Sequence, residues 1–399
     1  MIAKFFSLLT LLTAIKWVVF CIVVLLLPPI LLGIIRKVKA RLQGRIGASI
    51  LQPLRDLSKM LRKGETISVV TSWIFRSTSA INLAVVLLIA ILTPWISFKP
   101  ATVFGQTRAP HAASATDSES EIAGEESNPA APVGHVGQGT PGPLPVNSLN
   151  INGMSIYSQV DEKPLVEKIP EEQAFFGHAT TASDIFLIIY MFALARLFTV
   201  LAALDAGSVF GGFGASREVT LALLVEPAIV LALASLGCAA HTSDLNAIFG
   251  WSNTDSVISM PALWFIAGVG LFLASMVELS RMPVDDPTTH LELTMVHEAM
   301  ILENSGRNLA LVEYTHLLKM TILLGLTGQC FLHGIACFVD INHWTRDLLS
   351  ILFLILLAVS IAVIESITVK LRWTKVPEFI AYSVAMSLLC SFIAIGVGH

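Results

Sequence analysis

The chain has 399 residues, of which 54% are hydrophobic and only 14% charged, and its mean hydropathy is +0.75. A soluble protein carries about 25% charged residues, so this composition excludes the soluble globular class. The formal net charge of −4 is small, and we expect no nucleic-acid partner. An integral membrane protein in contact with the lipid bilayer is expected instead.

Continuously apolar windows follow one another along the chain. A helix needs about 20 mainly apolar residues to span a bilayer, and runs without alternation favour helices over barrel strands. The first run ends in Arg36 and Lys37 rather than in the small residues of a cleaved signal, so it predicts an uncleaved span. We therefore predict an all-α integral membrane protein with about eight transmembrane helices, near residues 8–35, 74–98, 181–204, 218–241, 258–280, 309–336, 347–369 and 377–397.

The segment after the first span, ARLQGRIGASILQPLRDLSKMLRKGE, predicts an amphipathic interfacial helix. Its apolar residues Ile50, Leu54, Leu57 and Leu61 recur with helical spacing. Such a helix either anchors the chain at the lipid surface, or grips a cytoplasmic partner or edges an entry to the membrane. The side chains expected to make structural or partner contacts here are Arg45, Gln52, Asp56 and Lys59.

The distribution of charge predicts an orientation. Residues 36–76 carry ten basic and two acidic side chains, whereas residues 99–178 carry four basic and ten acidic ones. Lys and Arg gather on the cytoplasmic side, so we place residues 36–76 inside, and both termini and residues 99–178 outside, in a cell inner or plasma membrane. The predicted organisation is residues 1–98 with the first two spans, an external acidic, low-complexity insert at 99–178, and a six-helix bundle at 179–399.

Two further patterns bear on cofactors. GSVFGGFGAS at 207–216 loosely resembles a dinucleotide loop, but it follows a membrane helix rather than a strand, so we expect a tight inner turn with close packing. The five cysteines are scattered and include no C-x-x-C pair. Iron–sulfur, nickel and zinc sites need clustered ligands, so no metal, cofactor or redox centre is expected in this chain.

Ionisable side chains inside the spans mark either buried ion pairs or a path for ions. Arg196 in the third span could lock helix packing by pairing with a carboxylate, and Glu226 directly precedes Pro227 in the fourth. In the sixth span Glu313, His316 and Lys319 are three residues apart and share one face. Carboxylates, imidazoles and amines in a dry interior can accept and release protons. The spacing therefore predicts a proton relay.

Residues 278–303, ELSRMPVDDPTTHLELTMVHEAMILE, gather carboxylates between two apolar spans. Pro283 and Pro287 predict a turn, and THLELTMVHEAMILE predicts a helix with a threonine cap and with Glu292 and Glu303 on one face. A solvated acidic loop is the alternative, but the interleaved apolar residues favour burial. HLELTMVHE does not match the H-E-x-x-H of zinc proteases.

One long segment, RMPVDDPTTHLELTMVHEAMILENSGRNLALVEY, closely resembles the family of formate hydrogenlyase subunit 4 and hydrogenase-4 component C, which is homologous to subunit 1 of respiratory complex I. Three further stretches agree in the same order: QGRIGASILQPLRDLSKMLRK, LAALDAGSVFGGFGASREVTLALLVEP and VIESITVKLRWTKVPEF. The resemblance covers residues 1–98 and 179–399.

The resemblance implies a subunit beneath a soluble [NiFe]-hydrogenase module, coupling its redox chemistry to proton or Na⁺ movement. The implied partners are the hydrogenase large and small (Fe–S) subunits on the cytoplasmic side and antiporter-like membrane subunits. The Fe–S clusters and the NiFe centre would belong to those partners. In complex I the acidic loop runs roughly E-x-x-R-x-P-x-D-x-P-E-x-E-x-E; here Thr288 and His290 replace two of its glutamates. That departure favours the hydrogenase branch over quinone binding.

The sequence thus predicts a membrane-arm subunit of an oxidoreductase complex. The alternatives are a quinone-cavity subunit of a complex-I-like dehydrogenase, a free-standing ion-coupled transporter, which missing repeats disfavour, and a purely structural anchor. We expect Arg281 to hold the loop carboxylates by bidentate pairing. The predicted proton pathway comprises Glu226, Glu278, Asp285, Glu292, Glu298, Glu303, Glu313, His316 and Lys319, and the remaining structural or partner contacts are Arg196, Arg217, Arg281, Asp286 and Arg372.

Overall fold

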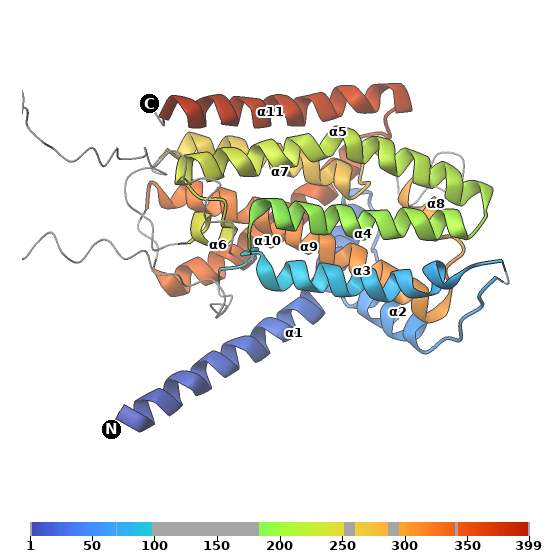
Figure 1. Ribbon diagram of the computed structural model, residues 1–399, viewed down its shortest axis with the longest axis horizontal. Helices are drawn as coiled ribbons and strands as arrows, with labels where there is room; N and C mark the ends of the chain where they lie inside the picture. Colours follow the sequence, from blue (N-terminus) through green and yellow to red (C-terminus); the bar gives the residue numbers. More distant parts are fainter. Residues whose placement is uncertain are drawn as a thin grey trace, which may run out of the picture. The chain divides into compact units, whose positions relative to one another are not determined.

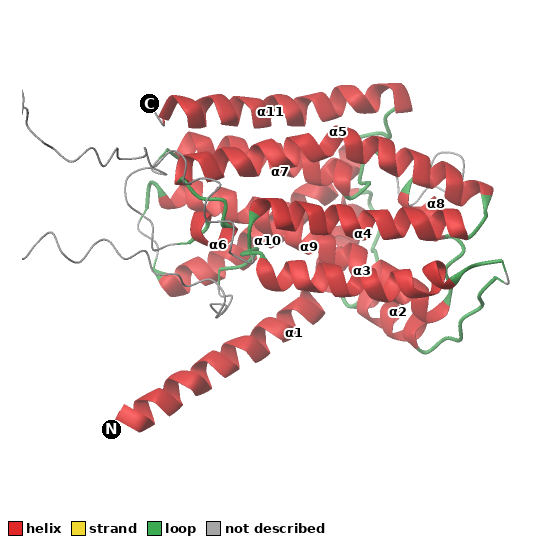
Figure 2. Cartoon of the chain, viewed as in Figure 1, coloured by secondary structure: helices red, strands yellow, loops and turns green. Residues whose placement is uncertain are grey.

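The structure, a computed structural model, describes residues 2–68, 70–97, 183–250, 260–285, 295–339 and 342–397. Eight of its helices are long and apolar enough to cross a membrane. No strand occurs in the described ranges (Figure 2). The predicted all-α fold with eight spans is therefore confirmed. The predicted division at residues 98/99 and 178/179 falls outside the described residues and stays a prediction.

The membrane helices pack as a bundle, from which the N-terminal end of the first of them slants away (Figure 1). They are α1 (Ile2–Leu42), α3 (Trp73–Leu92), α4 (Ile185–Asp205), α5 (Val209–Ala240), α7 (Pro261–Glu278), α9 (Gly306–Ala336), α10 (His343–Ile367) and α11 (Val376–Val397). The short elements are α2 (Gln52–Leu61), α6 (Leu245–Ile248), α8 (His297–Ile301) and the 3₁₀ turn η2 (Trp373–Lys375). Helix α9 lies at the centre, where α1, α2, α3, α7 and α10 pack against it.

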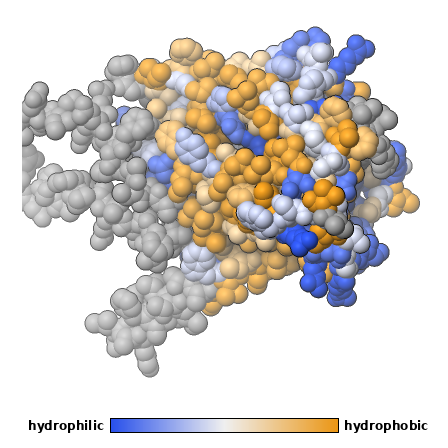
Figure 3. Space-filling view, turned by 45° about the vertical axis from the view of Figure 1, so that its right-hand side comes forward, coloured by the Kyte–Doolittle hydropathy of each residue, from blue (hydrophilic) through white to orange (hydrophobic). Residues whose placement is uncertain are grey.

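One end of the bundle, which we call the loop end, gathers α2, α8, residues 279–285 and residues 368–372 (Figure 1). Backbone and side-chain hydrogen bonds tie these segments together: Leu371 N–H donates to Pro283 O at 2.9 Å, and Thr66 N–H donates to Ser305 Oγ at 2.9 Å. An apolar band covers much of the visible surface, and hydrophilic residues gather toward the loop end (Figure 3). This division is typical of a protein whose flank faces lipid and whose end faces water.

The glycine-rich segment at 207–216 differs from the expected turn. Gly207 has a positive φ of 67°, but Ser208 caps α5 by accepting a hydrogen bond from Gly211 N–H, and the residues from Val209 onward are helical. A Cβ atom on Gly214 would lie 2.8 Å from Val296 O and 3.1 Å from Ala299 Cβ. Gly214 therefore lets the segment around α8 seat directly on α5. The expected close packing is present, but within a helix.

The helix predicted after the first span is present as α2, but its buried stripe shares only Leu57 with the predicted one. It begins at Gln52, so Ile50 precedes it, and Ile50 and Leu61 are exposed. Pro53 and Leu57 are buried, and Met60 packs against the core. The reason is that α2 lies against α1 and α9, which favours the Pro53–Leu57–Met60 stripe.

The helix predicted for the acidic loop is shorter within the described residues. Asp286 and Glu292 lie outside them, and Met295 and Val296 are not helical, so the helix spans His297–Ile301. Side chains from other elements bind this backbone: Arg217 donates to Met295 O at 3.1 Å, and Val296 N–H donates to Asp285 Oδ2 at 2.9 Å. Such side-chain bonds compete with helix formation.

We expect Gly214→Ala to destabilise the protein, since the added Cβ meets backbone and overpacking costs about 1–3 kcal/mol. Gly212→Ala is the matched control: nothing lies within 4 Å of its added Cβ, and alanine stabilises a helix interior by about 1 kcal/mol relative to glycine. The measurement is the thermal unfolding midpoint of the detergent-purified protein. Equal unfolding midpoints for the two variants would contradict the close packing of the α8 segment against Gly214 of α5.

Candidate functional site

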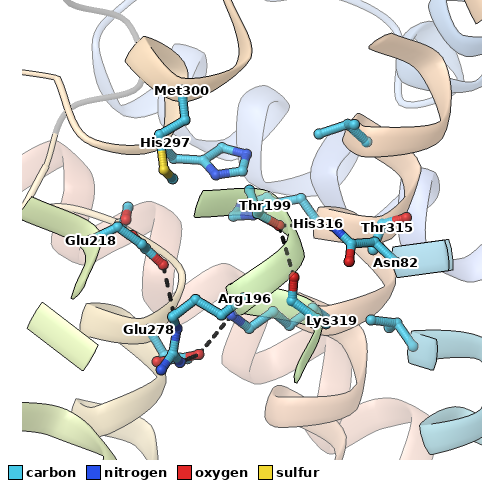
Figure 4. Close-up of a pocket in the computed structure, with 14 residues that line it drawn as sticks. Asn82, Arg196, Thr199, Glu218, Glu278, His297, Met300, Thr315, His316 and Lys319 are labelled. Atoms are coloured by element: carbon cyan, nitrogen blue, oxygen red, sulfur yellow. Dashed lines mark hydrogen bonds and ion pairs between the residues drawn. The ribbon is translucent and has the colours of Figure 1, made fainter. Parts of the chain in front are cut away.

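The buried Arg196 of α4 lies at the centre of an ion-pair cluster (Figure 4). Its guanidinium pairs with Glu226 of α5 and with Glu278 at the end of α7, and its Nε lies 3.7 Å from Glu218 Oε1. Lys319 of α9 adds a second cation, with Nζ 2.6 Å from Glu278 Oε1. We call these five residues the central cluster.

The charges of the central cluster do not balance. Two cations, Arg196 and Lys319, face three carboxylates, and the Glu278 side chain is only 4% exposed. A net charge of −1 is unfavourable in a poorly solvated interior. One bound proton neutralises it, so the cluster can hold and exchange a proton.

A second set of ion pairs lies nearer the loop end. Glu365 of α10 pairs with Lys39 of α1 at 3.2 Å and with Arg281 at 3.4 Å. Lys370 Nζ lies 2.6 Å from Asp285 Oδ1. The expected bidentate pairing of Arg281 with the loop carboxylates stays a prediction, since among the described residues Arg281 pairs with Glu365 and Asp285 with Lys370. Arg281 points to α10 because the chain reverses direction after α7.

That reversal separates two charges that are close in sequence. Arg281 N–H donates to Met276 O and Ser280 N–H to Val277 O, the bond pattern of a Schellman motif. Ser280 takes the left-handed position with φ 46°, which glycine usually occupies. As a result Glu278 joins the central cluster while Arg281 reaches Glu365.

Two cavities follow these charges through the bundle. The central cavity, about 50 Å³, is lined by Arg196, Glu218, Glu278 and Lys319 among others. The loop cavity, about 120 Å³, is lined by Arg281, Asp285, Glu298, Glu313 and Glu365 among others. Ser280, His297 and His316 line both. A polar site needs about 10–15 Å³ of such volume for one water, so both cavities have room for water.

The pKa values of the two titratable groups of α8, His297 and Glu298, are shifted in opposite directions. Burial lowers the pKa of His297 to about 4, with Lys319 and Arg281 adding to the effect. Burial also raises the pKa of Glu298 to about 7, and Glu313 and Asp285 add to the rise while Arg281 and Arg36 oppose it. Glu298 can therefore exchange a proton near neutral pH.

Most predicted pathway residues converge on these cavities. Glu278, Lys319 and His316 line the central cavity, and Glu226 joins its cluster; Asp285, Glu298, Glu313 and again His316 line the loop cavity. Glu303 is exposed and lines neither, while Asp286 and Glu292 lie outside the described residues. The roles assigned to all these residues stay predictions.

The predicted contact residues lie mainly at the loop end. Arg217 binds Met295 O, and its guanidinium lies 5.7 Å from the ring centre of Trp373. Gln52 Nε2 donates to Asp56 Oδ1 at 2.8 Å within α2, and Lys59 lines a surface groove. Arg45 and Arg372 are exposed. Arg196 makes the predicted pairing with carboxylates, but it does so beside the central cavity.

Several residues of the site escaped the sequence analysis. Glu218 lies eight residues before Glu226, two turns along one face of α5, and that spacing was an available signal. Lys39 appeared as one of many basic residues near the first span, and no local pattern paired it with Glu365. Likewise, no local sequence pattern indicated that the ring of His297 would stack on that of His316.

Eight spanning helices around buried ion pairs and water-sized cavities define a polytopic membrane protein with a charged interior. A sequence model of the NADH dehydrogenase family matches residues 15–114 and 166–396, and the chain belongs to this family. Among the described residues no group of three or more His, Cys, Asp and Glu side chains could hold a metal ion.

Two curated relatives come from Escherichia coli (strain K12). Hydrogenase-4 component C is 25% identical over 316 residues, 78% of this chain and 73% of that protein. Formate hydrogenlyase subunit 4 is 25% identical over 308 residues, 76% and 73% respectively. A chain of the membrane-bound sulfane sulfur reductase (MBS), an archaeal respiratory membrane complex, shares the fold with a TM-score of 0.63 at 15% identity, covering 96% of this chain and 99% of that one.

Removing Arg196 should expose the charge imbalance of the central cluster. Arg196→Leu leaves buried carboxylates poorly compensated, and we expect a loss of about 3–5 kcal/mol in unfolding free energy. Adding Glu226→Leu should recover about 0.5–3 kcal/mol relative to the sum of the single changes. Unfolding of the purified chain checks this, with the exposed Arg76→Leu as the control. Strictly additive effects would refute the coupling.

Glu298→Gln should change how stability depends on pH. Because the pKa is raised from 4.5 to about 7, the folded protein retains a proton that the unfolded chain has released. Wild type should therefore lose stability relative to Glu298→Gln as the pH rises from 4.5 to 7. The measurement is the difference between their unfolding midpoints at each pH. A flat difference over that range would show that Glu298 titrates normally.

Proposed function

We propose that this chain is a membrane-arm subunit of an energy-converting, hydrogenase-type oxidoreductase complex. It would couple electron transfer in a soluble module to translocation of protons or Na⁺. The observation that carries the proposal is the pair of cavities in series, which lead from the loop end to the central cluster. The names of the two Escherichia coli relatives support the class of complex.

The route would begin at Glu298, which can bind a proton near neutral pH. It would continue through the loop cavity to the central cluster, whose excess carboxylate takes up one proton. A change of charge in a redox module docked at the loop end would alter the proton affinity of these groups. The coupling is then electrostatic, and the central cluster is the last group of the route within this chain.

The orientation and the soluble partners form part of the proposal. Basic residues such as Arg36, Lys39, Arg55 and Lys59 lie at the loop end, and this bias supports a cytoplasmic location for it. There it would face the hydrogenase large and small subunits, to which we assign the NiFe centre and the Fe–S clusters. The groove lined by Leu54, Arg55, Ser58, Lys59 and Arg62 on α2 suits an acidic partner surface.

A membrane partner is supported by Glu226. Its side chain is 37% exposed although it lies near the middle of α5. An acidic side chain at mid-membrane costs about 2.5–3.5 kcal/mol against lipid, so a polar neighbour is favoured there. An antiporter-like membrane subunit would cover this position and receive the proton.

The cavity sizes favour ions over quinone. Pockets for organic ligands are typically about 300–1,000 Å³, whereas the central and loop cavities measure about 50 and 120 Å³ within the described residues. A complex-I-like quinone site is therefore the less supported alternative.

The proposal is tested by a tagged pull-down from native membranes in mild detergent, with metal analysis and hydrogen-driven dye reduction. Co-purifying nickel, iron and hydrogenase activity support it. Fe–S subunits without nickel, or with quinone reduction, would replace it by a complex-I-like function. Recovery of the chain alone would favour a free-standing transporter.

Glu226→Gln should leave assembly and dye reduction intact while proton movement per turnover falls at least tenfold, because the amide cannot exchange a proton. Proteoliposomes with a pH-sensitive dye provide the measurement. Glu65→Gln, at an exposed position outside both cavities and outside the predicted pathway, is the matched control. Unchanged proton movement in Glu226→Gln would contradict the pathway and favour a purely structural anchor.

A further inference from the structure

The central and loop cavities meet at a pair of stacked imidazoles. His297 of α8 and His316 of α9 have ring centres 4.2 Å apart with an interplanar angle of 26°. Both residues line both cavities. Ser280, the third shared residue, contributes a hydroxyl group that is not acidic near neutral pH. The histidine pair therefore provides the titratable groups of the shared wall.

One atom of this pair has an unfulfilled hydrogen-bonding capacity. His297 Nε2 is buried and finds no hydrogen-bond partner in the described part of the chain. A buried polar atom of this kind calls for a partner such as water. Both adjoining cavities have room for water, since each exceeds the volume that one molecule needs.

The surrounding charges suit a transient proton carrier. Lys319 and Arg281 flank the pair, and together with burial they lower the pKa of His297 to about 4. The resting imidazole is thus neutral and has one nitrogen ready to accept a proton. Once protonated, it releases the proton readily because two fixed cations repel it. Double occupancy of the stacked rings is excluded by the same repulsion.

We propose that His297 and His316 form the proton bridge between the loop cavity and the central cavity. The inference rests on the proposed function and identifies the step that joins its two halves. Water protonated from Glu298 or Glu313 gives a proton to an imidazole nitrogen, and the imidazolium passes a proton to water that meets the central cluster. One proton enters and one leaves, the excess carboxylate accepts it, and no redox change is involved.

The bridge also depends on where α8 sits. Asp285 binds Val296 N–H, Arg217 binds Met295 O, and Gly214 admits the backbone next to α5. These contacts fix the residue immediately after Val296, which is His297. They set the position of one imidazole against the other, which the rigid helix α9 carries.

The test uses the native complex in proteoliposomes, with dye reduction and proton movement measured together. His297→Phe and His316→Phe retain a stacked ring but remove the nitrogens. We expect both to assemble, to keep dye reduction, and to lose at least tenfold in protons moved per turnover. His333→Phe, a half-buried residue of α9 outside both cavities, is the matched control and should retain coupling.

If His297 and His316 served only in packing, the phenylalanine variants should keep coupling, because phenylalanine preserves the ring stacking. The glutamine variants should then lose coupling, because glutamine abolishes the stacking. Normal coupling in either phenylalanine variant, with loss in the corresponding glutamine variant, would overturn the bridge. If a phenylalanine variant fails to assemble, His297→Gln and His316→Gln decide: retained coupling in either refutes the proposal. Normal coupling in the histidine variants, together with a defect in Glu226→Gln, would refute the bridge and leave the proposed function standing. Normal coupling in Glu226→Gln as well would refute the proposed function.

Discussion

The pairing of Arg196 with carboxylates from α5 and α7 is the interaction on which the interior of this protein depends. Isolated ions are among the least favourable groups to bury, and here five ionisable side chains share one region between α4, α5, α7 and α9. Their mutual attraction offsets part of the desolvation and fixes the relative positions of four helices. The unbalanced charge that remains is the feature on which the proposed proton exchange depends, since a balanced set of ion pairs would not need a bound proton.

The loop end is organised by side chains that bind backbone. Lys370 holds Asp285, Asp285 holds Val296 N–H, and Arg217 holds Met295 O. This chain of contacts runs from the α10–α11 connection through the α7 corner to α8. A partner that binds here would therefore act on the same groups that position His297. Electrostatic and mechanical coupling would then be exerted at the same place.

The spans could be predicted because apolar length is a local property of the sequence, and the individual charges within them could be flagged because each is costly in lipid. Their partners could not. The Lys39–Glu365 pair joins residues 326 positions apart, and nothing local to either end specifies the other. Similarly, 207–216 contained the glycines of a turn, but only Gly207 lies in the turn and the later glycines lie in α5, where Gly214 admits the close approach of Val296.

The order of the groups also constrains the mechanism. Arg281 and Glu278 are three residues apart, yet the left-handed Ser280 directs one toward Glu365 and the other toward Arg196. A proton in the loop cavity and a proton in the central cavity are thus separated by a short, rigid corner. Fixed cations on both sides, Arg281 and Lys319, disfavour a resting positive charge at that boundary. On the proposed path, protons would rest on the carboxylates of either cavity and not between them. A charge change at the loop end would then move a proton forward instead of spreading it along the path.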